Sequence, residues 1–140
     1  MWRGKLPHWR ADDVRYYVTF RHRRELNESE RHVLFSQILR GEGRQLDLLV
    51  LCVMPNESEM IFEVGTDAEF SDFIEKAKTK AAKKIMKVTG ERFPPLYNES
   101  FDRIVRDDDE FEERWMEIVH RPEEQELGPA DDYATLYLKS

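Results

Sequence analysis

The longest apolar run in the chain, LLVLCVMP from Leu48 to Pro55, constrains the fold more than any other feature. It has the length of a single strand, and a strand without polar alternation must be covered on both faces. We therefore expect a central strand from Gln45 to Met54, inside a sheet with other elements on both sides. The run is far shorter than the roughly 18 apolar residues that cross a bilayer, so we expect no membrane partner.

Patterns on either side of this strand predict the other elements. β-Branched and aromatic residues predict strands over residues 14–22, 59–64 and 100–106. Capping-box sequences and acidic first turns predict helices that begin near Asn27, Thr66 and Asp107. We expect these helices to run to about residues 40, 88 and 120, the last ending at Pro122.

The resulting order is β-α-β-β-α-β followed by α, which is the split βαβ order of a ferredoxin-like fold. The predicted fold class is therefore α+β, with an antiparallel sheet and an additional C-terminal helix. A chain of 140 residues suits one domain, which we place at residues 1–122. Residues 123–140 have no clear periodicity, and we expect them to form a tail.

The charge is divided unevenly along the chain. Residues 1–87 carry 16 basic and 14 acidic side chains, whereas residues 88–140 carry 6 basic and 15 acidic ones. The first part can face a polyanion, and the second would repel one. The single cysteine, Cys52, lies in the apolar run and is expected to be buried, and no apolar stretch follows Arg3 and Lys5 as in a signal peptide. We expect a cytoplasmic protein.

Four stretches in a fixed order resemble the REP-associated tyrosine transposase family, in which members cut single-stranded DNA at hairpin-associated sites. They are LPHW leading into YVTFR (residues 6–9 and 17–21), the turn VMPN (residues 53–56), a lysine-bearing helix, and SFDRIVRD (residues 100–107). The resemblance implies a transposase-type domain that binds single-stranded or hairpin DNA, as a monomer or a homodimer.

The resemblance also implies two catalytic features, and this sequence departs from both. Family members carry His-x-His after the Met-Pro-Asn turn, and these histidines hold a divalent ion that polarises the scissile phosphate. Here the positions are Glu57 and Glu59. Two carboxylates at i and i+2 share one face of a strand and could hold Mg²⁺ or Mn²⁺. The alternative interpretation is a pair of solvated acidic residues, with no cofactor expected.

The nucleophilic tyrosine of the family lies on the last helix in a Tyr-Ile-x-x-Asn-Pro sequence. Alignment on Pro122 places Glu117 at the tyrosine position and Arg121 at the asparagine position. No catalytic residue is therefore expected, although a shifted register could recruit Tyr97, Tyr133 or Tyr137. His8, His22, His32 and His120 have no ligand spacing and are interpreted as surface or packing residues.

Lysines at helical spacing predict a basic face on the second long helix, opposite an apolar side. This face is interpreted either as a DNA-binding face, as the family resemblance implies, or as a solvated surface. The residues assigned to DNA binding are Lys76, Lys80, Lys83, Lys84 and Lys87, with Arg3, Lys5 and Arg21 from the N-terminal part. The first hypothesis is a transposase-like DNA-binding protein without catalytic activity. A repurposed scaffold that acts through protein contacts and a carboxylate-dependent metal nuclease are the alternatives.

Overall fold

A computed structural model of the chain describes residues 13–44, 46–65 and 71–139. The N-terminal segment with Arg3, Lys5 and His8 lies outside the described residues, as does the capping-box sequence Thr66–Glu69.

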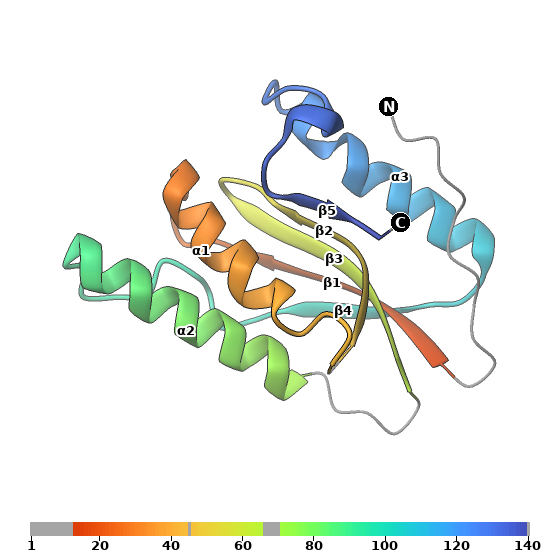
Figure 1. Cartoon of the computed structure of the whole chain (residues 1–140), viewed down its shortest axis with the longest axis horizontal. Coiled ribbons are helices and arrows are strands. Elements are labelled where there is room, and N and C mark those ends of the chain that lie inside the picture. Colours follow the sequence, from red (N-terminus) through yellow and green to blue (C-terminus); the bar gives the residue numbers. More distant parts are fainter. Residues whose placement is uncertain (1–12, 45, 66–70, 140) are drawn as a thin grey trace.

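Five strands form one sheet, in the order β4-β1-β3-β2-β5, and all neighbouring strands are antiparallel. The strands are β1 (Asp13–Arg21), β2 (Asp47–Val53), β3 (Glu57–Gly65), β4 (Phe101–Val105) and β5 (Leu136–Leu138). The helices are α1 (Glu28–Leu39), α2 (Ser71–Thr89) and α3 (Asp108–Glu124), with a short 3₁₀ turn η1 (Ala130–Asp132). Helices α1 and α2 cover one face of the sheet and α3 covers the other (Figure 1). The predicted ferredoxin-like α+β fold with an extra helix is confirmed.

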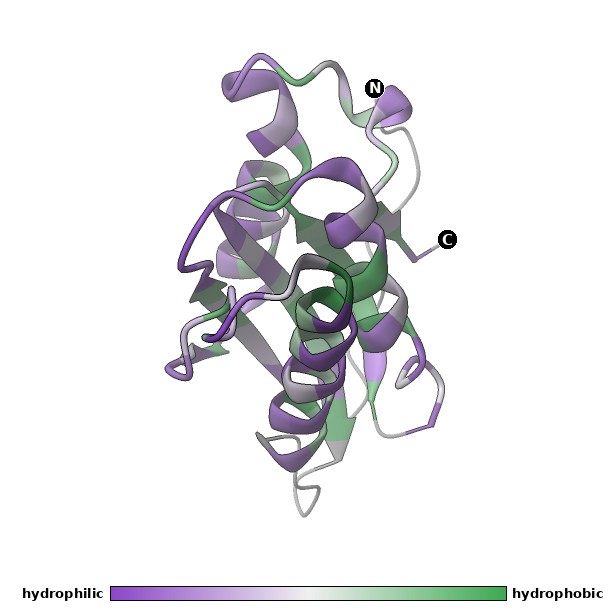
Figure 2. Ribbon diagram, turned by 90° about the vertical axis from the view of Figure 1, so that its left-hand side faces the viewer, coloured by the Kyte–Doolittle hydropathy of each residue, from purple (hydrophilic) through white to green (hydrophobic). Residues whose placement is uncertain are grey.

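Strand β2 is covered on both faces, as its apolar sequence predicted. Leu48 and Leu51 belong to the core beneath α1 and α2, whereas Val50 and Cys52 belong to the core beneath α3. Figure 2 shows hydrophobic residues gathered along the strands and the inward sides of the helices, with hydrophilic residues on the outer turns. Burial of both sets of side chains removes apolar surface from water on both sides of the sheet, which holds the three layers together.

Helix α1 begins where the sequence predicted. The Asn27 side chain accepts a hydrogen bond from the Glu30 N–H, and the Glu30 carboxylate accepts one from the Asn27 N–H, so the capping box is complete. At the end of α1, a Cβ atom on Gly41 would collide with the Phe73 ring of α2. The absence of a side chain at Gly41 therefore lets the end of α1 approach α2 closely.

Helix α3 is longer than predicted, because Pro122 lies inside it instead of ending it. The Asp107 side chain caps the start of the helix by accepting from the Glu110 N–H. Proline removes one donor, but the helix continues for two more residues, and the Gln125 N–H still bonds to the Arg121 carbonyl. The Pro122 ring is buried with the apolar face of α3, and this packing favours the extra turn.

The last residues contribute to the sheet, although no element was predicted after residue 122. Strand β5 pairs with the edge of β2. Before it, the Tyr133 hydroxyl and the Thr135 hydroxyl both donate to the Val53 carbonyl, at 2.8 and 2.7 Å. A three-residue strand is too short to give a readable period, so these contacts could not be predicted from alternation. None of the described helices is long and apolar enough to cross a membrane.

Candidate nucleic-acid interface

Glu57 and Glu59, the residues at the predicted metal-ligand positions, lie at the start of β3 on the face of the sheet that α3 covers. In the strand register Glu57 is opposite Arg21 and Glu59 is opposite Thr19, both on β1. The two carboxylates therefore share a face, as their spacing predicted. Their surroundings differ, because Glu57 is partly exposed whereas only 2% of Glu59 is accessible.

Glu59 is bound by two protein side chains. Arg121 Nε donates to Glu59 Oε1 at 2.8 Å, and Arg121 Nη2 donates to Glu59 Oε2 at 3.1 Å. The Tyr17 hydroxyl donates to the same Oε2 at 2.8 Å. The interpretation of Glu59 as a solvated acidic residue is therefore wrong: its carboxylate is buried, and its charge is compensated by a bidentate guanidinium.

The amphipathic pattern of α3 explains why Arg121 reaches this position. The buried residues of α3 follow one another at helical spacing: Phe111, Trp115, Ile118, Val119 and Pro122. Arg121 borders this buried stripe one turn after Ile118, so its side chain is directed to the sheet where β3 begins. Trp115 is buried and belongs to the core beneath α3. The alignment on Pro122 identified Arg121 only as the residue at the family's asparagine position. Its partner in the structure, Glu59, is 62 positions away in the sequence.

The charges of this cluster are strongly coupled. Hydrogen bonding to Glu59 raises the pKa of the Arg121 guanidinium, so this side chain stays positive. Burial, together with the negative charge of Glu59, raises the pKa of the Tyr17 phenol well above its ordinary value. Burial and then Glu59 also raise the pKa of Glu57. Arg114 lies over the Tyr17 ring at 4.9 Å and adds a second positive charge to the cluster.

The residues at this site do not fit a divalent metal ion. Both oxygens of Glu59 already accept hydrogen bonds from Arg121, and one accepts a further bond from Tyr17. Across residues 13–44, 46–65 and 71–139, no group of three or more His, Cys, Asp or Glu side chains is arranged to hold a metal. The positive charge that faces Glu59 is the guanidinium of Arg121. Of the two glutamates, Glu57 is therefore the more available to a ligand.

The tyrosines considered as substitute nucleophiles occupy three different environments. Tyr133 is buried and donates to a backbone carbonyl, and burial raises its pKa. Tyr137 lies on β5 and packs against the core beneath α1 and α2. Tyr97 is 42% exposed and lines the same surface pocket as Glu57. Glu117, at the family's tyrosine position, is on the surface of α3 and pairs with Arg114 at 3.7 Å.

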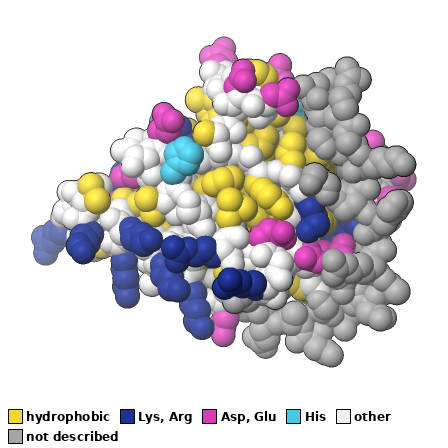
Figure 3. All heavy atoms as spheres, viewed as in Figure 1, with side chains coloured by type: hydrophobic (Ala, Val, Ile, Leu, Met, Phe, Trp, Pro, Cys, Tyr) yellow, Lys and Arg dark blue, Asp and Glu magenta, His cyan; other side chains and the backbone are white. Residues whose placement is uncertain are grey.

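Helix α2 presents the predicted lysines on its outer side. All five are exposed, and none forms an ion pair with another described residue: Lys76, Lys80, Lys83, Lys84 and Lys87. We call these five residues the lysine face. Figure 3 shows dark-blue basic side chains gathered along α2 at the lower left. On the opposite side of the helix, Ile74, Ala77, Ala81 and Ile85 are buried, as predicted.

Lys78 belongs to the same run of lysines but has a different environment. It is buried, and its ammonium donates to the carbonyls of Asn98 and Glu99 and to the hydroxyl of Ser100, at 3.0, 3.4 and 3.1 Å. The ammonium also lies 4.5 Å from the centre of the Phe20 ring. Burial lowers the pKa of Lys78. Lys78 therefore fixes the segment before β4 to α2 and is not part of the lysine face.

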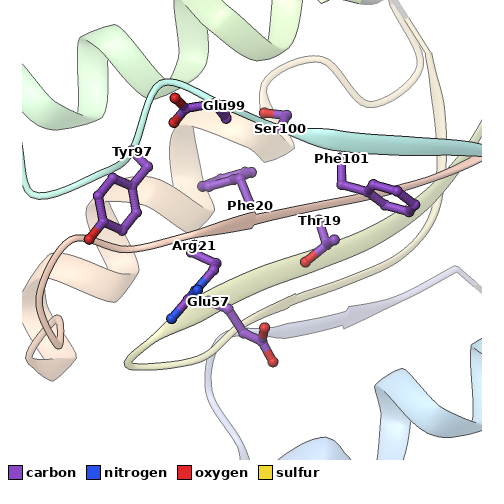
Figure 4. Close-up of a pocket in the computed structure, with 8 residues that line it drawn as sticks. All are labelled: Thr19, Phe20, Arg21, Glu57, Tyr97, Glu99, Ser100 and Phe101. Atoms are coloured by element: carbon purple, nitrogen blue, oxygen red, sulfur yellow. The ribbon is translucent and has the colours of Figure 1, made fainter.

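A hollow of about 640 Å³ lies between the end of β1, the start of β3 and the start of β4. We call it the β1–β4 hollow, and its lining residues are Thr19, Phe20, Arg21, Glu57, Tyr97, Glu99, Ser100 and Phe101. In Figure 4, Thr19, Arg21, Glu57 and Phe101 project to the same side of the sheet, and Tyr97 lies at the end of β1. Arg21 is exposed and lines this hollow, so this predicted DNA-binding residue does not belong to the lysine face on α2.

Sequence reasoning did not identify three members of these sites. The sequence patterns identify Tyr17 only as part of a strand, Arg121 only as a replaced asparagine, and Phe101 only as part of a motif. Phe101 begins a strand whose first four residues are all exposed, and this exposure is known only from the structure. Tyr17 and Arg121 gave no sequence signal either, because each acquires its role through Glu59, which is distant in sequence.

Comparison of the sequence with models of protein families, and with curated proteins, finds no match. Comparison of the structure does. A REP-associated tyrosine transposase bound to a REP hairpin matches with a TM-score of 0.72 and 13% sequence identity, over 96% of this chain and 82% of that one. A candidate transposase from Deinococcus radiodurans R1 matches with a TM-score of 0.56 and 13% identity, over 84% of this chain and 96% of that one.

At 13% identity these matches carry the fold alone. The structural matches agree with the sequence motifs, whose identity and order along the chain resemble the same family independently of the fold. The chain has the fold of the REP-associated tyrosine transposases, the family that its sequence motifs resemble.

Proposed function

We propose that this protein binds single-stranded or hairpin DNA through a transposase fold and does not cleave it. The observation that carries the proposal is the lysine face, where five exposed lysines lie on one helix without ion-pair partners among the described residues. Phosphates neutralised by such side chains release condensed counterions, and this release drives binding without regard to sequence. A solved transposase of the same fold is bound to a REP hairpin, which makes hairpin DNA the first ligand to test.

The cluster around Glu59 supports the second half of the proposal. A metal-dependent strand cleavage needs free ligands for the ion and an accessible nucleophile. Here the carboxylate of Glu59 is occupied by Arg121 and Tyr17. The position of the family's tyrosine is Glu117, and a carboxylate does not form a stable phosphodiester link to DNA. Glu59 is therefore not a free metal ligand, and Glu117 is not a suitable nucleophile.

The surface of α3 favours a second candidate function. Exposed acidic residues follow the outer side of this helix and the turn after it: Asp108, Asp109, Glu112, Glu113, Glu123, Glu124 and Glu126. A surface of one sign repels DNA and attracts a basic partner. If DNA does not bind, the alternative is a scaffold that contacts a basic protein through α3. If DNA does bind, we expect it to avoid the outer side of α3.

Fluorescence anisotropy with a labelled DNA hairpin that carries a single-stranded tail tests the proposal. We expect binding that weakens with salt, is unchanged by Mn²⁺ and yields no cleavage product. The variant Lys83→Gln/Lys84→Gln should flatten the plot of log affinity against log salt by about 1.4–1.8, since each phosphate contact contributes roughly 0.7 on single strands and 0.9 on duplex.

A matched control removes the same charge elsewhere. Arg40 and Arg44 are exposed near the end of α1, and Arg40→Gln/Arg44→Gln should leave the salt dependence unchanged. Equal effects of the two double variants would show that net charge, and not the lysine face, determines binding. Binding or cleavage that requires Mn²⁺ would support the carboxylate-dependent nuclease instead. No binding at low salt would contradict the DNA proposal and favour the scaffold.

A further inference from the structure

From the β1–β4 hollow we infer a binding site for one unpaired nucleobase, specifically a base with an exocyclic amino group, in the single-stranded part of the bound DNA. This inference rests on the proposed function, because it names what the protein holds apart from phosphate. Three features of the hollow carry it: exposed aromatic rings, a carboxylate with a neighbouring arginine, and a wall that is fixed to the lysine-bearing helix.

The aromatic rings are Phe101 and Tyr97. Phe101 is 60% exposed and Tyr97 is 42% exposed, although both are large side chains. Phe101 lies opposite Thr19 in the register of β4 and β1, so its ring extends from the sheet surface, as Figure 4 shows. Exposed aromatic side chains along a positively charged path are the platforms on which single-stranded nucleic acids stack their bases.

The polar groups favour an amino-bearing base over a bare phosphate. Glu57 and Arg21 are partners in the register of β3 and β1, and both line the hollow. A carboxylate accepts hydrogen bonds from the amino group of a base, as Glu and Asp do with cytosine. Glu57 and Glu99 together outnumber Arg21, so a phosphate alone would be repelled. With the base beside Glu57, Arg21 is available for the phosphate of the same nucleotide.

The wall of the hollow is held in place by α2. Lys78 binds Asn98, Glu99 and Ser100, and the Tyr97 N–H donates to the Arg21 carbonyl at 3.2 Å. Tyr97 also lines a second groove, which lies beside α2 and includes Lys83. The lysine face and the hollow are therefore joined through Tyr97. A strand whose phosphates follow α2 can place a neighbouring base in the hollow.

The experiment compares DNA hairpins that differ only in the tail. Anisotropy is measured with a blunt hairpin and with hairpins that carry tails of dC, dA, dG or dT, of equal length. Thymine lacks an exocyclic amino group, so we expect dT tails to bind more weakly than the other three. Phe101→Ala should reduce the affinity for a dC-tailed hairpin about tenfold, within the range for loss of one stacked base, and leave the blunt hairpin unchanged.

Ile104→Ala is the matched control. Ile104 lies on the same strand and is 51% exposed, but it is outside the hollow. It should change neither affinity. Glu57→Gln, which retains the shape of the side chain, should reduce the preference for dC over dT severalfold without changing the binding of the blunt hairpin.

The failures of this inference and of the proposed function are distinguishable. If Lys83→Gln/Lys84→Gln flattens the salt dependence as expected while Phe101→Ala and Ile104→Ala behave alike, the proposed function stands and the nucleobase site is wrong. If tails bind equally whatever their base, Glu57 does not select an amino group, which overturns the amino-base inference. If neither blunt nor tailed hairpin binds, the proposed function and this inference both fail.

Discussion

Arg121 on α3 and Glu59 on β3 form a bidentate ion pair, with Nε–Oε1 at 2.8 Å and Nη2–Oε2 at 3.1 Å. Glu59 is one of the two positions at which the resemblance to tyrosine transposases implies a histidine that holds a divalent ion. In this protein the strand contributes a carboxylate and the helix contributes the cation. The pair therefore joins α3 to the sheet by protein groups alone.

Removal of one partner should be more harmful than replacement of both. Arg121→Met leaves the buried Glu59 carboxylate without its cation, and we expect the free energy of unfolding to fall by about 3 kcal/mol. The double variant Arg121→Met/Glu59→Gln should recover most of that loss, because the amide of glutamine is neutral and still accepts from Tyr17. Urea unfolding of Arg121→Met, Glu59→Gln and the double variant measures the coupling between the two residues.

Glu124→Gln is the control, because Glu124 is an exposed partner of Arg121. This substitution should change the free energy of unfolding by less than about 0.5 kcal/mol. Equal losses in the single and double variants would contradict this account.

The same pair leads to a prediction about metal binding. In the wild type, Mn²⁺ should leave the melting temperature unchanged, because Arg121 occupies Glu59. In Arg121→Ala the carboxylates of Glu57 and Glu59 become available together, and two oxygen ligands on one strand face can bind a hard cation weakly. We expect millimolar Mn²⁺ to raise the melting temperature of that variant by a few degrees. Adding Glu57→Gln should abolish the rise, and a rise in the wild type would show that Arg121 does not exclude the ion.

The fold could be predicted because its signals are local. The apolar run of β2, the capping box at Asn27 and the cap at Asp107 each lie within a few residues, and each element formed where those patterns placed it. The predicted end of α3 at Pro122 was wrong, because the Pro122 ring is buried with the helix and α3 continues to Glu124. Strand β5 was missed, because three residues that complete the edge of a sheet show no period of their own.

The environment of Glu59 could not be predicted from the sequence. Whether a carboxylate at the start of a strand is solvated or buried depends on what packs above it, and Arg121 is 62 residues away. The lysine face was predictable because helical spacing is a local property. The exclusion of Lys78 from that face is understood only from the structure, where its ammonium turns to the segment before β4.

His22 should make stability dependent on pH. Its Nδ1 donates to the Pro55 carbonyl and its Nε2 accepts from the Ser58 hydroxyl, each at 2.9 Å, so the ring is held neutral. Burial, with a smaller contribution from the charge of Lys78, lowers the pKa of His22 to about 4. The unfolded chain takes up a proton near pH 6.5, so this stability is present above pH 6.5 and is lost as the pH falls towards 4.

At pH 4.5 the loss due to His22 should be about 2.5 kcal/mol relative to pH 7. Urea unfolding at both pH values measures it, and His22→Gln is the matched variant because its amide can donate and accept without titrating. The difference between the two pH values should be smaller in His22→Gln by about that amount. An imidazole that becomes charged near pH 6.5 in the folded protein, followed by NMR, would contradict the assignment.

Lys78 should act as a positioning residue for the wall of the β1–β4 hollow. Its three acceptors lie in an exposed segment, so in Lys78→Met they can turn to water, and we expect a loss of only about 1 kcal/mol in global stability. The local effect should be larger. The Tyr97 amide, which donates to the Arg21 carbonyl, should exchange its hydrogen faster, because the segment is no longer fixed to α2.

Lys80→Met separates this role from that of charge. Lys80 belongs to the lysine face, so its loss should weaken the salt dependence of DNA binding and leave the exchange of the Tyr97 amide unchanged. Lys78→Met should do the reverse: it should preserve the salt dependence and reduce the affinity for tailed but not blunt hairpins. Hydrogen exchange and anisotropy on both variants decide the matter. If Lys78→Met and Lys80→Met alter the salt dependence equally, Lys78 contacts phosphate, and its hydrogen bonds to the segment before β4 do not govern the hollow.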